Sequence, residues 1–423
     1  MIDLQNSVER CIIVSAVKKG ANKYITNELL KEMSLLAETA GAEVIDTVYQ
    51  ELEKNNIATL IGKGKVEEIA ELIILEKINL VVFDNELSPI QLRNLEKAFN
   101  IKVLDRSGII LDIFASRAKT KQAKTQVELA QLQYMLPRLS RMWTHLSKQF
   151  GGIGTKGPGE TQIETDRRLI RNRIELLKES LKEISKQNYQ KRKNQNRLPR
   201  FGLVGYTNAG KSTLMKQITN ESVYIEDQLF ATLDTTTRKF TLPLGQDALL
   251  SDTVGFIRKL PTHLIASFES TLAEAKESDF LLHIIDISNE FFRDQIKIVN
   301  ETLDKLGIKS DDNIMVFNKI DKLIDNDEFT LIQEEFPNSI FISAYNEKSI
   351  SELLMLLQNK YNTLSQDIEI FLPYSESNLI SKVYQFSEVL MQSNNDEGYV
   401  IKLRVQNNSV GSFQNVFSSF IKS

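Results

Sequence analysis

The sequence predicts a multidomain α/β protein, and three observations support this fold class. The chain has 423 residues, enough for several domains of ordinary size. Hydrophobic residues make up 42% and charged residues 26%, so each domain can bury a core. Strand-like and helix-like segments alternate along much of the chain, which is typical of mostly parallel sheets covered by helices.

Composition also excludes several classes of protein. No apolar run approaches the roughly 18 residues that span a bilayer, and the first ten residues do not read as a signal peptide. The single cysteine, Cys11, excludes an internal disulfide framework and a cysteine-based zinc site. The C-terminal end has no cysteine for lipidation. We therefore expect a cytoplasmic monomer with no membrane anchor.

Residues 1–108 are expected to form a small N-terminal α/β domain, because short apolar runs alternate with helical periodicity. Its predicted strands cover residues 11–17, 43–49, 56–61, 79–84 and 101–104, and its predicted helices cover 24–40, 65–77 and 88–98.

Residues 109–197 are expected to form a basic antiparallel helical hairpin. Two stripes with spacings of three and four residues flank the glycine-rich stretch 151–159, which would form a long flexible tip. Pro137 should kink or shift the first helix, and the polar stretch 187–197 is a plausible linker. The stripes consist of Leu129, Leu132, Leu136, Leu139, Trp143 and Leu146, and of Ile170, Ile174, Leu177, Leu181 and Ile184.

This hairpin is strongly basic in an otherwise acidic chain. Residues 109–200 carry 20 lysines and arginines against 8 acidic residues, whereas the whole chain has a net charge of −4. Such a block suggests contact with a polyanion, although charge alone fits a solvated helix face equally well. The candidate RNA-binding residues are Arg167, Arg168, Arg171 and Arg173.

Residues 198–364 are expected to form a doubly wound, mostly parallel domain that binds a phosphate. An apolar strand precedes a glycine-rich loop that matches G-x-x-x-x-G-K-[ST], and a helix follows the loop. Backbone N–H groups of such a loop point at an anion, and the helix N-terminus adds positive potential. Lys211 would reach the β- and γ-phosphates and Ser212 would bind Mg²⁺. The predicted phosphate-binding residues are Gly205, Tyr206, Thr207, Asn208, Ala209, Gly210, Lys211, Ser212 and Thr213.

Three later motifs, each after a predicted strand, indicate guanine as the base. Asp321 can accept two hydrogen bonds from the N1–H and amino groups of guanine, whereas adenine presents an acceptor at N1. Ser343 and Ala344 would offer backbone N–H to the guanine oxygen. The motifs comprise Asp252, Thr253, Val254 and Gly255, then Asn318, Lys319, Ile320 and Asp321, then Ser343, Ala344 and Tyr345.

A switch segment should hold a threonine on Mg²⁺ while the γ-phosphate is present. The stretch from residue 230 to residue 237 offers four threonines, of which we favour Thr232 as a metal ligand beside Ser212. The predicted nucleotide-binding residues of this segment are Phe230, Ala231, Thr232, Leu233 and Asp234.

The hydrolytic machinery departs from that of Ras-like enzymes, in which a glutamine after this glycine orients the attacking water. Phe256 stands there instead and cannot bind water, so intrinsic hydrolysis should be slow and partner-stimulated. Lys211 and Gly255 are expected to stabilise the transition state. Asn208 either helps to hold K⁺ or only shapes the loop. Residues 365–423 are expected to form a small α+β domain.

Beyond these motifs, the chain resembles the HflX-type GTPases over nearly its whole length. The resemblance rests on the run 61–68, the run 126–132, Pro137-Arg138-Leu139, and above all 151–162 with Asp166-Arg167-Arg168. It implies a P-loop GTPase that binds the large ribosomal subunit through ribosomal RNA and splits stalled or stressed ribosomes or assists ribosome assembly. It also assigns the switch threonine to Thr232. The alternative is a non-catalytic, GTP-dependent RNA-binding module with degenerate hydrolysis.

Overall fold

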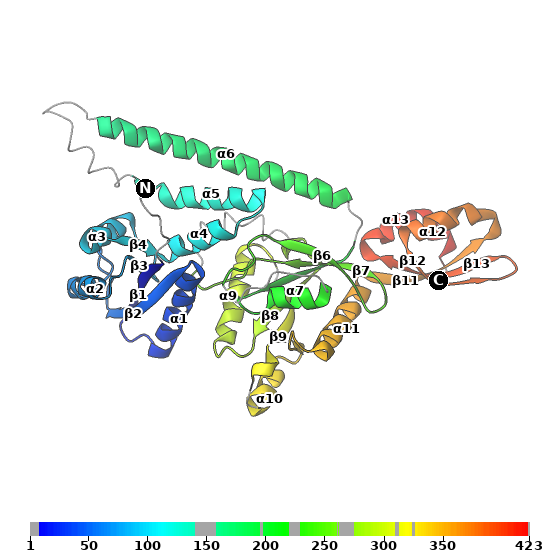
Figure 1. Ribbon diagram of the computed structural model, residues 1–423. Coiled ribbons are helices and arrows are strands. Elements are labelled where there is room, and N and C mark those ends of the chain that lie inside the picture. Colours follow the sequence, from blue (N-terminus) through cyan, green and yellow to red (C-terminus); the bar gives the residue numbers. More distant parts are fainter. Residues whose placement is uncertain are drawn as a thin grey trace. The chain divides into compact units, whose positions relative to one another are not determined.

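The computed structural model shows two compact units (Figure 1). One consists of residues 1–238 and 249–344, and the other of 239–248 and 345–423. The structure describes residues 8–139, 158–194, 198–219, 229–259, 261, 275–308, 313–323 and 326–421.

The N-terminal sheet is parallel throughout and has the strand order β2-β1-β3-β4. Alternate residues of β1 face opposite sides: Cys11 and Ile13 pack toward helices α1 and α4, whereas Ile12 and Val14 pack toward α2 and α3. Burial on both faces explains why the strand is apolar without interruption. The elements are β1 (Glu9–Lys18), α1 (Lys23–Thr39), β2 (Ala42–Leu52), α2 (Lys63–Leu75), β3 (Leu80–Phe83), α3 (Pro89–Phe99), β4 (Lys102–Asp105) and α4 (Arg106–Arg117).

The structure of this region differs from two of the expectations. The predicted strand 56–61 is wrong: these residues form a tight loop in which the Asn56 side chain accepts hydrogen bonds from the amides of Ala58 and Thr59. An asparagine that binds its own following backbone competes with strand pairing. The expected domain boundary at residue 108 falls inside α4, whose Ile110 and Phe114 pack in the same core as Met33 of α1.

The helical hairpin is present, and Figure 1 shows its helices α5 (Lys121–Met135) and α6 (Pro158–Asn194) side by side. Leu129, Ile174 and Leu177 are buried between them, as the stripes predict. Helix α5 ends two residues before Pro137. The glycine-rich stretch 151–157, Trp143 and Leu146 lie outside the described residues.

The predicted linker 187–197 is wrong for most of its length, because α6 continues to Asn194. Polar composition alone does not end a helix: glutamine, lysine and arginine are good helix formers. Proline is absent from this stretch until Pro199, so nothing there interrupts the helix.

The second sheet has the order β10-β9-β8-β5-β7-β6, and its pairs from β10 through β7 are parallel. The predicted doubly wound domain is therefore confirmed. Its elements are β5 (Arg200–Gly205), α7 (Lys211–Thr219), β6 (Thr236–Thr241), β7 (Asp247–Asp252), β8 (Phe280–Asp286), α9 (Phe292–Lys305), β9 (Ile314–Asn318), the 3-10 turn Ile320–Lys322, α10 (Asn326–Glu335) and β10 (Ile340–Phe341).

The C-terminal unit contains an antiparallel sheet of order β11-β13-β12 with helices packed on it. This confirms the small α+β domain expected over residues 365–423. Tyr345 begins this part of the unit, so α11 belongs to it. The elements are α11 (Glu347–Thr363), β11 (Ser365–Pro373), α12 (Ile380–Phe386), β12 (Glu388–Asn394), β13 (Gly398–Gln406) and α13 (Asn407–Phe417).

Candidate nucleotide-binding site

The glycine-rich loop lies between β5 and α7, and its backbone conformation requires glycine at two positions. Gly205 has φ 151°, and a Cβ there would lie 2.2 Å from the carbonyl oxygen of Ile284. Gly210 has φ 95°, and a Cβ there would lie 2.3 Å from the side-chain nitrogen of Asn318. A pocket opens over the loop and is lined by Thr207, Asn208, Gly210, Lys211, Ser212, Thr213, Phe230, Ala231, Thr232, Thr253 and Gly255.

Lys211 is buried at the base of this pocket. Its ammonium donates to the carbonyl oxygens of Gly205 at 3.0 Å and of Tyr206 at 2.7 Å. Burial lowers the pKa of Lys211 to about 8, although the Asp252 carboxylate opposes the shift. A desolvated cation of this kind gains a strong partner when an anion enters.

Three side-chain oxygen atoms that could act as metal ligands lie close together beside Lys211, and oxygen ligands suit a hard divalent cation. Ser212 Oγ lies 2.8 Å from Thr232 Oγ1 and 2.7 Å from Asp252 Oδ2. Asp252 Oδ1 is buried and has no hydrogen-bond partner, and burial raises the pKa of this carboxyl. Hydroxyl and carboxylate oxygens with a spare buried acceptor are what Mg²⁺ and its water ligands require. Elsewhere in the described residues, no cluster of three His, Cys, Asp or Glu side chains could hold a metal.

The predicted guanine motifs converge on the same loop. The Asn318 side chain donates to the Ala209 carbonyl oxygen and accepts from the Ala344 amide, each at 3.0 Å. Lys319 donates to the carbonyl oxygen of Asn208 at 2.8 Å and pairs with Asp286 at 2.6 Å. Asp321 is exposed in the turn after β9. Asn318 thus joins the phosphate loop to the Ser343-Ala344 segment.

The segment after β7 runs against the phosphate loop. Phe256 accepts from the Thr207 amide at 2.8 Å and donates its own amide to the Gly205 carbonyl oxygen at 3.1 Å. A Cβ on Gly255 would lie 2.8 Å from the Thr207 methyl group and 3.2 Å from Lys211 Nζ. Phe256 is 2% exposed, so its ring packs in the core and cannot orient a water molecule.

The structure does not bring all predicted residues to the pocket. Leu233 is buried in the hydrophobic core, and Asp234 binds the start of α5. Val254 also packs in the core, whereas Tyr345 is 77% exposed. Neither Ile320 nor Asp321 is among the residues that line the pocket as described.

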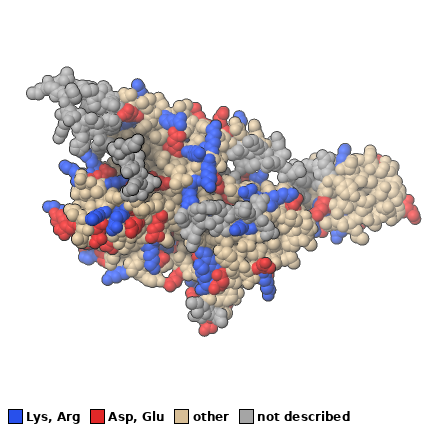
Figure 2. All heavy atoms as spheres, in the orientation of Figure 1, with Lys and Arg blue, Asp and Glu red and all other residues tan. Residues whose placement is uncertain are grey.

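Of the predicted RNA-binding arginines, Arg173 already has a partner. Its guanidinium makes two hydrogen bonds to Glu128 of α5, at 2.7 and 3.0 Å. Arg168 and Arg171 are exposed on α6, and Arg167 is half-buried. On the face that Figure 2 shows, basic and acidic side chains are interspersed along this helix.

Sequence reasoning missed the residues that connect the pocket to the N-terminal region. Phe114 of α4 meets the Phe230 ring edge-on, with 4.8 Å between ring centroids. Glu32 of α1 accepts a hydrogen bond from the Tyr206 hydroxyl. No local signal marks such residues, because each contact joins segments more than 100 positions apart.

Comparison with known proteins agrees with this geometry. Family models match along the chain: GTP-binding GTPase N-terminal over residues 27–115, GTP-binding GTPase Middle Region over 117–195, and 50S ribosome-binding GTPase over 200–319. A GTPase HflX from Flavobacterium psychrophilum is 49% identical over 369 residues, which cover 81% of this chain and 88% of that protein. The chain belongs to the HflX family of GTPases.

One further relative supports the HflX assignment and the resemblance expected from the sequence. A GTPase HflX from Escherichia coli K12 is 42% identical and covers 88% of both chains. A solved GTP-binding protein from Sulfolobus solfataricus, in complex with GDP, has a TM-score of 0.44 and 25% identity over 82% of this chain and 99% of that one.

This HflX-family protein is therefore a GTP hydrolase that belongs with ribosome-related GTPases. Its P-loop and mostly parallel sheet are those of a GTP-binding domain. Among the described residues, no helix is long and apolar enough to cross a membrane.

Proposed function

We propose that this GTPase binds the large ribosomal subunit and hydrolyses GTP there, and so acts in splitting stalled or stressed ribosomes or in ribosome assembly. One observation supports coupling between RNA contact and the pocket. Asp234, two residues after Thr232, accepts hydrogen bonds from the amides of Lys119 and Thr120 at 3.0 and 3.1 Å. These amides immediately precede α5, the first helix of the hairpin.

The same switch segment therefore serves two purposes. Thr232 lies at the candidate Mg²⁺ site, and Phe230, four residues before Asp234, packs against Phe114. A rigid hairpin attached to this segment moves with it, because a packed core responds by discrete shifts rather than continuous deformation. Displacement of the hairpin by RNA would thus reach Thr232 directly.

The proposed nucleotide position follows from the pocket. Loop amides and Lys211 would hold the β- and γ-phosphates, Asp321 would select guanine, and the Ala344 segment would face the guanine oxygen. When bound at Ser212 and Thr232, Mg²⁺ would neutralise charge that develops on the phosphates. Gly255 and Lys211 would stabilise the transition state. The alternative of a non-catalytic module is set aside, because the family consists of GTPases.

Basal hydrolysis should be slow, since Phe256 fills the position from which glutamine orients water in Ras-like enzymes. The ribosome would complete the site. We expect turnover by purified protein to rise when large subunits are added, and fast turnover without them would contradict this proposal.

Asn208 offers a second route to charge stabilisation, through a bound K⁺. Its backbone has φ 61°, a conformation that asparagine tolerates, so the loop-shaping interpretation also stands. Turnover rates measured in K⁺ and in Na⁺ decide between them, and equal rates would remove K⁺ from the proposal.

Sedimentation with separated ribosomal subunits tests the central claim. We expect co-sedimentation with the large subunit in the presence of a non-hydrolysable GTP analogue and much less with GDP. Exchanging Arg167, Arg168 and Arg171 for glutamate should weaken binding, and binding should fall steeply with salt. The control reverses Lys276, Lys297 and Lys305, which are exposed on the GTPase domain. Unchanged sedimentation of the arginine variant would remove the hairpin from the proposal.

A further inference from the structure

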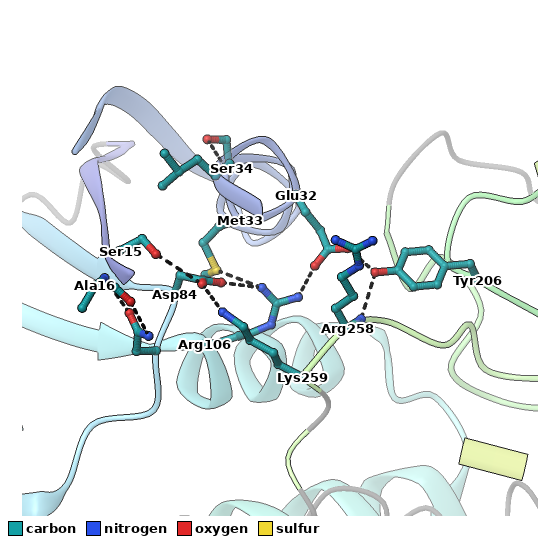
Figure 3. Close-up of polar contacts among 12 residues, drawn as sticks. Ser15, Ala16, Glu32, Met33, Ser34, Asp84, Arg106, Tyr206, Arg258 and Lys259 are labelled. Carbon is teal, nitrogen blue, oxygen red and sulfur yellow. Dashed lines mark hydrogen bonds and ion pairs between the residues drawn. The ribbon is translucent and has the colours of Figure 1, made fainter. Parts of the chain in front are cut away.

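A buried ionic cluster lies at the carboxyl ends of β1 and β3 (Figure 3). In the order β2-β1-β3-β4, strand β2 lies on one side of β1 and strand β3 lies on the other, so the direction of the connections reverses at β1. Open α/β sheets bind ligands at such a reversal. Here the position is taken by Asp84, which follows β3, is 1% exposed and lies 3.4 Å from the Ser15 hydroxyl.

The charges of this cluster balance only when the GTPase domain contributes to it. Arg106, itself 1% exposed, pairs with Asp84 at 2.8 Å and with Glu32. Burial opposes the charge on Arg106, but the Glu32 and Asp84 carboxylates outweigh it and raise its pKa. Among the described contacts, the second cation is Lys259, whose Nζ lies 2.5 Å from Asp84. With Arg106 as the sole cation, buried Asp84 and partly buried Glu32 would leave an uncompensated negative charge.

Glu32 carries the connection from this cluster to the phosphate loop. It accepts from the Tyr206 hydroxyl, which in turn accepts from the Arg258 amide at 2.9 Å. Tyr206 also provides a carbonyl oxygen that holds Lys211 at 2.7 Å. Figure 3 shows Glu32 between Arg106 and Tyr206. The segment 256–259 is thus fixed at its far end by the N-terminal region.

Two residues of the switch segments lie close to the phosphate loop. Gly255 lies directly over Lys211, where an amide can meet a γ-phosphate. Thr232 lies within 2.8 Å of Ser212, as shared binding of Mg²⁺ requires. GDP has no γ-phosphate and gains nothing from Gly255, whereas GTP gains a contact only if the segment stays closed.

We propose that Asp84 and Glu32 are positioning residues that hold segment 256–259 closed and thereby favour GTP over GDP. Because coupling between two sites is reciprocal, bound GTP also strengthens attachment of the N-terminal region to this segment, and GDP releases it. The proposal concerns nucleotide binding by the chain itself and does not depend on ribosome binding.

Nucleotide titration of the full-length protein tests this, with a fluorescent non-hydrolysable GTP analogue and with GDP. Lys259→Met removes the cation but leaves Asp84 paired with Arg106, so the fold should survive. Glu32→Gln weakens the bond to the Tyr206 hydroxyl without changing side-chain size. The matched control is Lys102→Met, because Lys102 pairs with Glu9 and its side chain is 47% exposed, against 44% for Lys259.

We expect Lys259→Met and Glu32→Gln each to weaken binding of the GTP analogue about fivefold or more, with GDP binding unchanged. Lys259→Arg should retain the wild-type preference, and Lys102→Met should behave as wild type. Equal weakening of both nucleotides, or no weakening of the analogue, would overturn the proposal. Retained GDP binding shows that the variants are folded.

Discussion

The N-terminal sheet and the GTPase-domain sheet differ in what occupies the point where the strand order reverses. Each has a strand-order reversal, at β1 in the N-terminal sheet and at β5 in the GTPase domain, and each places polar side chains at the carboxyl ends of its strands. After β5 the chain leaves an open pocket above Lys211. After β1 and β3, side chains of the chain itself occupy the position, with Lys259 paired to Asp84.

The difference lies in which polar groups have partners. In the GTPase domain Lys211 is bonded only to backbone carbonyls among the contacts described, and Asp252 Oδ1 has no partner. These are the groups to which we assign a phosphate and a metal. At the N-terminal sheet, Asp84 already has Arg106, Lys259 and Ser15. A satisfied ionic cluster binds one region to another, whereas an unsatisfied one binds a ligand.

The largest effect on GTP turnover should come from removing the charge of Lys211 in the open pocket. Lys211→Met removes the charge that faces the phosphates, and we expect GTP turnover to fall roughly 100-fold or more. Lys216→Met is the control, because Lys216 is exposed on the same helix α7. Steady-state phosphate release measures both, and near-normal turnover by Lys211→Met would contradict the assignment of this pocket.

Base selection should be the next largest effect. Asp321→Asn places an N–H group opposite the guanine donors, and each charged hydrogen bond lost costs about 1.5–3 kcal/mol. We expect GTP affinity to fall while the weak affinity for ATP stays the same, as measured by calorimetry. If the variant kept the wild-type preference for GTP over ATP, Asp321 would not be the residue that reads the base.

The pH dependence of GTP affinity tests the role of Lys211 without any substitution. The pKa of Lys211 is about 8 because burial disfavours the charged form. Below pH 8 the ammonium is present before binding, whereas above pH 8 binding must take up a proton. GTP affinity should therefore be constant from about pH 7 to 8 and fall by up to tenfold per unit above it. A GTP affinity that rises with pH above pH 8 would contradict the predicted direction.

The smallest effect concerns the contact between the switch segment and the hairpin. Asp234→Ala removes the acceptor for the amides of Lys119 and Thr120, and the net contribution of such a hydrogen bond is about 1 kcal/mol. Hydrogen exchange at these two amides should become roughly fivefold faster. Glu53→Ala, which breaks an exposed pair with Lys19, is the control. Unchanged protection at Lys119 and Thr120 would show that this link carries no stability.

Local patterns predicted the pocket well and its surroundings poorly. The strand before Gly205, the helix from Lys211 and the position of Asn318 follow from apolar runs and short motifs. The loop 56–61 was misread because Asn56 folds its own backbone into a turn, which a β-rich composition does not reveal. The end of α6 at Asn194 was missed because polar residues that form helices well resemble a linker.

By itself, the sequence determined the phosphate loop, the order of the motifs predicted to bind guanine and the pairing of α5 with α6, because each depends on residues a few positions apart and on the period of a helix or strand. Only the tertiary structure decided that Lys259 meets Asp84, 175 positions away, and that Asp234 meets Thr120. Such pairs form when packing of the hydrophobic cores brings distant segments together, and the burial of Asp84 makes its charge require a partner.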